Sequence, residues 1–370
     1  MPDKQIETIS RNLVLVRVMF IIFLVSGVAA AQSASRSATL STAEIQAQFG
    51  LPSERPTAHL AFTSGAKERA EQQNGTDAAY TGFTYLPYNY GPIMQTSKIY
   101  LIFWEPPQLQ DGRASGVPAN FNNIMYQYVV DINGSKLLQT QTQYWMLTNS
   151  GYSYVQNSVS YGGYYLDTTT PYPRNACWNQ ITQYNCVRDD QIQAEIQKAI
   201  RVNNWTGGYN NLFIVYTGRG EGSCSGWYQN GVCTPKNAAY RDYCGYHQYY
   251  NGAAGPVIYA YITYPDSATT NGNGGCWSSL PAWPHGDIFI DAALSMTSHE
   301  HFEAITDPIP GQGWYDWVEN TENADKCKWN FAPLRYGAYG NQYMNGHYYT
   351  LQNEFSDARF NAGLYPCVGR

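Results

Sequence analysis

The stretch that decides both the fold and the site runs from Ser298 to Pro308 and reads SHEHFEAITDP. An acidic residue, Asp291, stands upstream of it, where the dipole of a helix favours negative charge in the first turn. Proline lacks the N–H that a continuing helix needs. The sequence therefore predicts a helix from about Asp291 to Asp307, ended by Pro308.

Two metal-binding side chains share one face of this predicted helix. His299 and Glu303 are four positions apart, about one helical turn, so an imidazole and a carboxylate can grip the same cation. Glu300 then occupies the position of a general base beside the metal, as in a His-Glu-x-x-His zinc helix whose second histidine is replaced by a carboxylate. His301 points nearly opposite to His299. The alternative interpretation is a solvated helix face that carries charged residues without chemistry.

A third ligand is expected from the acidic segment that follows. Glu322 is the first choice, because it lies nineteen positions after Glu303. That spacing resembles thermolysin-like enzymes, in which a glutamate on a following helix completes the site and a nearby aspartate orients the first histidine. Asp325 would be that orienting group, and the two residues can also exchange roles. The expected cofactor is Zn²⁺ or another divalent cation.

Outward from this helix, the pattern favours an α/β (α+β), zincin-like layered domain with a mixed sheet and an active-site helix. Runs rich in β-branched and aromatic residues predict strands, and apolar residues on one face predict two more helices. The predicted strands are Lys98–Trp104, Tyr144–Thr148, Leu212–Tyr216 and Val257–Tyr264, and the predicted helices are Phe121–Ile132 and Asp189–Val202. The stretches 151–165 and 271–284 read as long loops.

The amino end reads as an export signal. Basic residues precede the apolar run from Val18 to Val25, and small residues follow up to Ala31, so residues 1–31 are predicted to be a signal peptide. A membrane anchor is the alternative, but the apolar run is shorter than the roughly 20 residues that a spanning helix needs. Residues 32–78 contain few aromatics and predict a flexible spacer or a pro-region. Residues 79–370 are expected to form a single metallopeptidase-like domain, with no stable membrane insertion after the leader is removed.

Eight cysteines follow the leader, and an even number in an exported chain predicts paired disulfides. A metal–thiolate cluster is the competing interpretation, which the absence of any Cys-x-x-Cys pair disfavours. Cys177 and Cys186 are plausible partners by proximity, and a bond between Cys327 and Cys367 would tie down the carboxyl end. The net charge of −6 and the lack of a dense basic cluster argue against nucleic acid as a partner.

Several separated motifs give the chain a resemblance to a known family. It resembles the EXORDIUM or phosphate-induced protein family and its bacterial and fungal relatives over roughly residues 85 to 370. The motifs are Tyr88–Pro92 (YNYGP), Ile102–Trp104 (IFW), Tyr243–His247 (YCGYH) with Cys276, and the final block Ser298–Pro308, Gly313–Asp316 and Glu322–Cys327 (ENADKC). Only Ala324 departs from that block, where the family has glycine. The resemblance implies an extracellular location more safely than an activity.

These observations predict a secreted metal-dependent hydrolase, most simply a zinc peptidase acting on a peptide or on a cell-wall or matrix substrate. Glu300 would accept a proton from water, and His247, from the YCGYH element, would donate to a tetrahedral intermediate. The strand Val257–Tyr264 could bind substrate along its edge. The alternative is a non-catalytic extracellular or cell-wall protein that keeps a structural metal site, or binds carbohydrate through its 33 tyrosines and 10 tryptophans. By type alone, His247, His285 and His347 favour hydrogen-bonding or surface roles over metal ligation.

Overall fold

The computed structural model describes residues 82–369, apart from 227, 230, 234–236, 254 and 266–275. The predicted signal peptide and the predicted spacer or pro-region therefore lie outside the described residues. The described residues fall within one compact unit.

A five-stranded mixed sheet forms the centre of this unit, in the order β10-β11-β6-β1-β4. Its strands are β1 (Ser97–Trp104), β4 (Val159–Asp167), β6 (Asn211–Thr217), β10 (Gly245–Gly252) and β11 (Gly255–Ile262). Strand β1 runs parallel to β4 and β6, β11 runs parallel to β6, and β10 pairs antiparallel with β11. The middle strands are almost continuously apolar because both faces of the sheet are covered.

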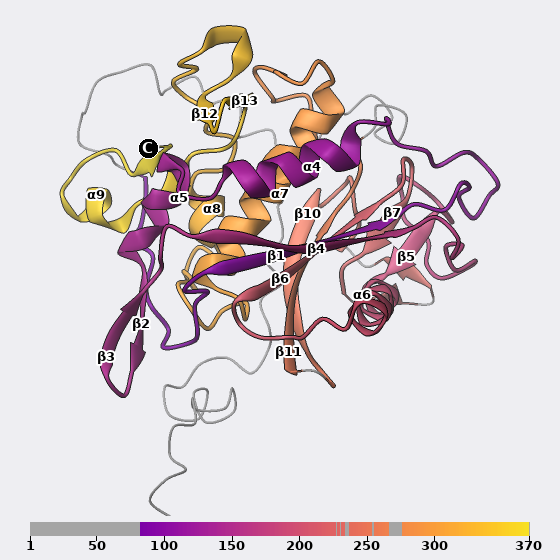
Figure 1. The fold of residues 1–370 in the computed structure, drawn as a ribbon, viewed down its shortest axis with the longest axis horizontal. Coiled ribbons are helices and arrows are strands. Elements are labelled where there is room, and N and C mark those ends of the chain that lie inside the picture. Colours follow the sequence, from indigo (N-terminus) through magenta and orange to yellow (C-terminus); the bar gives the residue numbers. More distant parts are fainter. Residues whose placement is uncertain are drawn as a thin grey trace, which may run out of the picture. The chain divides into compact units, whose positions relative to one another are not determined.

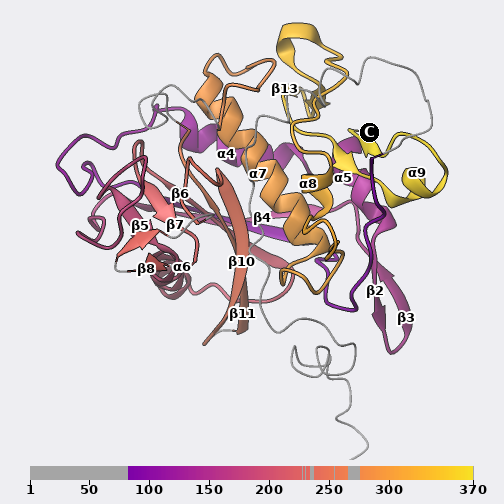
Figure 2. The same ribbon diagram turned by 180° about the vertical axis from the view of Figure 1, so that it is seen from behind.

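Helices pack on both faces of the sheet (Figures 1 and 2). Helices α4 (Phe121–Asp131) and α7 (Ile288–Thr306) lie over one face, and α6 (Asp189–Asn203) lies over the other. Successive side chains along a strand point to opposite faces of the sheet, so the strands can pack against helices on both sides. Phe103 and Tyr216 stack on the α4 side, where the Tyr216 hydroxyl meets Thr297 of α7, while Phe213 packs against Trp205 beyond α6.

The predicted strands and helices agree with the structure in type, and the clearest error is the loop predicted over residues 151–165. That stretch contains β3 (Gly151–Tyr154) and all but the last two residues of β4, which forms an edge of the main sheet. The glycines in this stretch are typical of loops, so the sequence did not indicate the strand. A Cβ at Gly162 would lie 2.6 Å from the ring of Tyr100, so only glycine lets the two strands approach there. The strand predicted at Tyr144–Thr148 is β2 (Trp145–Thr148), which pairs with β3 in a separate hairpin.

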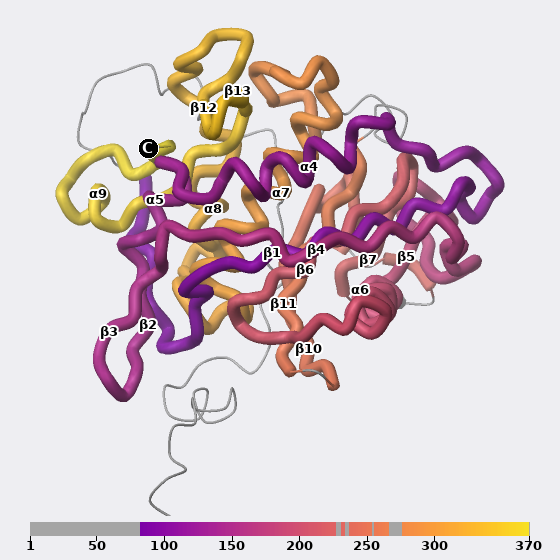
Figure 3. The backbone as a smooth tube through the Cα atoms, in the orientation of Figure 1, coloured from indigo at the N-terminus to yellow at the C-terminus, as the bar shows by residue number. Residues whose placement is uncertain are grey.

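The remaining elements are short. They are α5 (Lys136–Gln139), η2 (Thr140–Gln143), α8 (Asn323–Lys326), η3 (Gly337–Tyr339), α9 (Asp357–Asn361), β5 (Cys186–Arg188), β7 (Gly222–Cys224), β8 (Tyr228–Gln229), β9 (Val232–Cys233), β12 (Gln342–Met344), β13 (His347–Tyr349), β14 (Glu354–Phe355) and β15 (Cys367–Val368). Figure 3 shows the path of the carboxyl-terminal part, in which α8 lies against α7 and Asn323 and Ser356 bond to side chains of η2.

Four disulfides tie these segments together, and they include the two pairs considered from the sequence. The bonds are Cys177–Cys186, Cys224–Cys233, Cys244–Cys276 and Cys327–Cys367. The first two lie against each other, with Cys186 Sγ 3.8 Å from Cys224 Sγ, but all four sulfurs are paired as disulfides and none is a free thiolate. Among the described residues, no helix has the length and apolar character needed to cross a bilayer.

Candidate metal centre

Helix α7 carries the centre, and it is buried all around. It starts at Ile288, three residues before the predicted start, because Asp287 caps it by accepting a hydrogen bond from the Phe289 amide at 2.8 Å. From Ile290 to Thr306 every residue of α7 is buried, including its histidines and glutamates. The solvated-face interpretation of the motif is therefore wrong.

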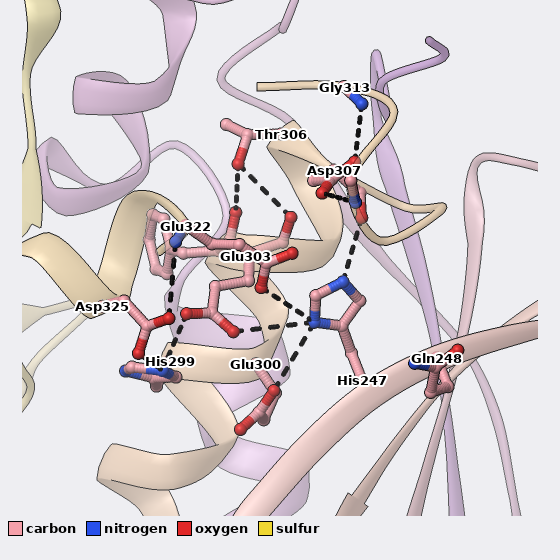
Figure 4. A network of polar contacts seen from close by, with 12 residues as sticks. His247, Gln248, His299, Glu300, Glu303, Thr306, Asp307, Gly313, Glu322 and Asp325 are labelled. Atoms are coloured by element: carbon pink, nitrogen blue, oxygen red, sulfur yellow. Dashed lines mark hydrogen bonds and ion pairs between the residues drawn. The ribbon is translucent and has the colours of Figure 1, made fainter. Parts of the chain in front are cut away.

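Six ionisable side chains from three elements converge on one region (Figure 4). They are His299, Glu300 and Glu303 from α7, Glu322 and Asp325 from the start of α8, and His247 from β10. The loop between α7 and α8 turns back on the helix, because Asp307 accepts hydrogen bonds from the amides of Gly311, Gln312 and Gly313. This turn brings the acidic segment over the helix face, as the sequence predicted.

The first set of possible metal ligands lies around one nitrogen of His299. Its Nε2 lies 2.9 Å from Glu303 Oε1 and 3.9 Å from Asp325 Oδ1. Its other nitrogen, Nδ1, is 3.3 Å from Oε1 of Gln352, an oxygen that also accepts from the Trp329 amide. Because this oxygen can only accept, Nδ1 carries a proton, and Nε2 is the nitrogen that faces the carboxylates.

The second set surrounds one nitrogen of His247. Its Nε2 lies 2.9 Å from the carbonyl oxygen of Asp307, which fixes the proton on that nitrogen. Its Nδ1 lies 3.6 Å from an oxygen of Glu300, 3.6 Å from one of Glu303 and 3.7 Å from one of Glu322. Gly245 on the same strand leaves the necessary space, since a Cβ there would sit 3.0 Å from Glu300 Oε1.

The other histidines in the described part of the chain lie away from this cluster. His301 points to the opposite side of α7, as predicted, where its Nδ1 lies 3.1 Å from the Tyr128 hydroxyl. Burial lowers the pKa of His301 to about 3, so this ring is neutral. His285 pairs with Asp291 and the half-exposed His347 pairs with Asp131, which agrees with the hydrogen-bonding roles expected for them.

The charged groups of the cluster strongly shift one another's pKa values. Burial disfavours charge on both rings, yet the facing glutamates raise the pKa of His247 to about 10 and that of His299 to about 9. Although burial acts in the opposite direction, the charge of His299 holds the pKa of Glu303 well below its usual range. Burial, together with the charges of Glu303 and Asp307, raises the pKa of Glu322 well above its usual range. A region with this affinity for positive charge holds either protons or a cation.

The hydrogen bonds of the cluster are incomplete. Within the described part of the chain, eight buried atoms of the cluster lack a hydrogen bond of good geometry, although two of them, His299 Nε2 and Glu303 Oε1, form an ion pair at 2.9 Å: His247 Nδ1, His299 Nε2, both carboxylate oxygens of Glu300 and of Glu322, Glu303 Oε1 and Asp325 Oδ1. Buried polar atoms are rarely left without partners, because each costs about 1–3 kcal/mol. Imidazole nitrogens and carboxylate oxygens are ligands of Zn²⁺ and of similar divalent ions, so the residues present fit such an ion.

The sequence predicted His247 at the site but not the strand that carries it, gave no indication of Gln352, and predicted a substrate edge that the structure contradicts. His247 joins the carboxylates because β10, a strand that the sequence did not reveal, runs beside α7. Its place in the YCGYH element was the available signal. Gln352 gave no signal, since nothing near it in the chain is unusual. The substrate edge expected at Val257–Tyr264 is wrong, because β11 is paired on both sides, by β10 and by β6.

No protein-family model, no curated protein and no solved structure matches this chain. The resemblance to the EXORDIUM family therefore stays a prediction based on the quoted motifs.

Proposed function

We propose that the protein is a secreted metal-dependent hydrolase, most simply a peptidase, with an ion held by His299, Glu303 and Asp325. The observation that supports this most is the group of buried donor atoms without hydrogen bonds around α7. Four disulfides support an oxidising, extracellular destination. We assign Gln352 as the group that orients His299, the role for which Asp325 was first considered.

A divalent ion bound there would polarise the carbonyl of a scissile bond and acidify a water. Glu300 is the residue that accepts the proton in this proposal. Both of its oxygens lack hydrogen bonds, and it follows His299 directly on the helix. Burial raises the pKa of Glu300 above its usual range. A carboxylate next to a bound ion is a suitable acceptor for the proton of an activated water.

The alternative function is a structural metal site in a non-catalytic extracellular protein. The observation that favours it is the burial of the site from solvent. His247, His299, Glu300, Glu303 and Glu322 are each at most 3% exposed. A catalytic site needs an open coordination position and a path for substrate, whereas structural sites are closed. Zinc content alone does not separate the two functions, so the test must separate metal binding from hydrolysis.

The experiment compares two substitutions in the full chain. His299→Ala should lose the ion, because it removes a ligand, while Glu300→Gln should keep the ion and abolish cleavage of peptide and ester substrates. His301→Gln is the matched control, since His301 is equally buried on the same helix but lies outside the cluster. It should retain both ion and activity.

Each outcome has a definite meaning. Metal retained in His299→Ala at the wild-type level contradicts the proposed site. Metal that depends on His299, with no hydrolysis by the wild type of any peptide or ester in a broad library, establishes the structural role instead.

A second candidate function is carbohydrate binding, and one surface feature favours it. Four exposed tyrosines gather on β12, β13 and η3, with ring centroids 4.9–6.0 Å apart: Tyr336, Tyr339, Tyr343 and Tyr348. Two of them line a groove of about 610 Å³ that also contains amide side chains such as Asn341 and Asn345. Aromatic faces beside amide groups are suited to a ligand that is apolar on one side and hydroxylated on the other.

Binding to insoluble cellulose, xylan and chitin tests this candidate. Tyr336→Ala and Tyr343→Ala should each weaken binding at least severalfold, whereas Tyr85→Ala, at an exposed tyrosine outside the groove, should not. Equal retention of all three variants, or no retention of the wild type, contradicts it.

A further inference from the structure

The surroundings of His247 are those of a metal ligand. Its Nε2–H is committed to the carbonyl oxygen of Asp307, so the lone pair of Nδ1 faces three glutamate oxygens. Lone pair and carboxylate repel each other unless a proton or a cation lies between them. A histidine that donates one N–H to a backbone carbonyl and turns its other nitrogen to carboxylates has the arrangement usual for metal-bound imidazoles.

The spacing of these atoms also fits an ion rather than direct hydrogen bonds. At 3.6–3.7 Å, the contacts from His247 Nδ1 to the three oxygens are too long for hydrogen bonds. Ligands on a tetrahedral Zn²⁺ with bonds of about 2.0–2.2 Å lie roughly 3.3–3.6 Å from each other. The space between His247, Glu303 and Glu322 therefore has the size of a cation site.

Glu303 belongs to both sets of possible metal ligands, because each of its two carboxylate oxygens faces a different histidine. Its Oε1 faces His299, and its Oε2 faces His247. Two groups of three ligands result, His299 with Glu303 and Asp325, and His247 with Glu303 and Glu322. A carboxylate shared in this way is suited to bridging two ions, as in the two-metal sites of hydrolases.

The balance of charge points the same way. Four carboxylates, those of Glu300, Glu303, Glu322 and Asp325, lie in the cluster with two histidines. Lys328 contacts Asp325 at 3.3 Å, but in the described part of the chain Glu300, Glu303 and Glu322 form ion pairs with histidines alone. One divalent ion leaves excess negative charge in a region closed to water, which is costly. A second ion offsets it.

We infer that the cluster holds two divalent ions, with a second one bound by His247, Glu303 and Glu322 and with Glu303 bridging the pair. This inference rests on the proposed function for the first ion and assigns His247 as a ligand instead of a donor to an intermediate. Glu300, whose Oε2 lies 3.6 Å from His247 Nδ1, stays beside both positions as the proton acceptor.

The test is the metal stoichiometry of the full chain after loading with Zn²⁺, measured by inductively coupled plasma mass spectrometry. The wild type should hold two ions per chain. His247→Ala and Glu322→Gln should each hold one, and Glu303→Gln should hold at most one, weakly. His285→Ala is the control, because this histidine pairs with Asp291 outside the cluster, and it should keep two.

A spectroscopic measurement gives a second readout that does not depend on activity. Loaded with Mn²⁺, the wild type should show the electron paramagnetic resonance spectrum of two coupled ions, and Glu322→Gln should show that of an isolated ion. Glu322→Gln preserves side-chain size, so it keeps the test valid if His247→Ala does not fold, which circular dichroism reports.

The outcomes separate this inference from the function on which it rests. One ion in the wild type, lost in His299→Ala and kept in His247→Ala, overturns the second site and leaves the proposed function in place. One ion lost in both variants shows a single merged site and also overturns the inference. No ion in the wild type overturns both proposals.

Discussion

Two charged clusters adjoin the short helix α8, one through Lys326 and one through Asp325, and they differ in where their positive charge comes from. Lys326 places its ammonium group 2.8 Å from Asp316, 3.1 Å from Glu319 and 2.8 Å from the Thr84 hydroxyl. Asp316 also accepts hydrogen bonds from the amides of Val318 and Glu319. This Lys326 cluster is therefore complete in itself.

The neighbouring residue Asp325 faces the α7 cluster, where eight atoms lack a well-formed hydrogen bond to any residue that the structure describes. Lys326 and Asp316 are buried, as the α7 cluster is, although Glu319 is exposed. Both clusters combine carboxylates with a cationic or basic partner. The difference is that the chain supplies a lysine to the first and only histidines to most of the second. A buried carboxylate with its own lysine is neutralised by the chain, whereas one without a lysine takes up protons or a cation from solution, and the proposed function assigns a cation.

The largest effect expected from this comparison is that of metal removal. Exhaustive dialysis against a chelator should destabilise the fold by on the order of 5–8 kcal/mol, since the binding energy of the ions is lost and the carboxylates remain buried. Differential scanning calorimetry should show a lower melting temperature that Zn²⁺ restores. An unchanged melting temperature after verified metal loss would show that the α7 cluster, like the Lys326 cluster, needs no ion.

A smaller effect is expected from Lys326→Met, which leaves Asp316 buried without its cation. The unfolding free energy should fall by about 3–5 kcal/mol. The loss should be similar in metal-loaded and metal-free protein, and the bound metal should not change, because Lys326 does not contact the α7 cluster. Adding Asp316→Asn should recover part of the stability, because it removes the unpaired charge. Release of metal by Lys326→Met would mean that the two clusters act as one.

The smallest expected effect is the loss, at acidic pH, of the stability that Asp316 contributes. Burial alone would raise the pKa of Asp316, but hydrogen bonds from Lys326 and Thr84 outweigh it and lower this pKa. A carboxyl group with a lowered folded-state pKa contributes stability above its unfolded value, about 3.9, and loses it as the pH falls through the folded value. Asp316→Asn should cost about 1–3 kcal/mol near pH 7.

Urea unfolding at several pH values checks this sign. The difference between wild type and Asp316→Asn should stay constant from about pH 7 to pH 5 and shrink below about pH 4. A difference that grows on acidification would show that Asp316 is not stabilised in its charged form.

Much of the centre could be predicted because it depends on local geometry. A turn of 3.6 residues places His299 and Glu303 on one face and turns His301 away, whatever surrounds the helix. Likewise, the acidic segment follows the proline-terminated helix after a short connection, so it must lie close to that helix. That Glu322 and Asp325 reach different histidines was not predictable, since it depends on the turn held by Asp307.

The sequence by itself determined the type of those strands and helices that it revealed, the presence of disulfides and the side chains that α7 offers to a metal, because periodicity and composition are properties of nearby residues. Only the tertiary structure decided that β10 carries His247 to the cluster, that Gln352 orients His299 and that the whole helix is buried. Each of these depends on pairing between residues far apart in the chain, and no local pattern encodes the order of strands in a sheet.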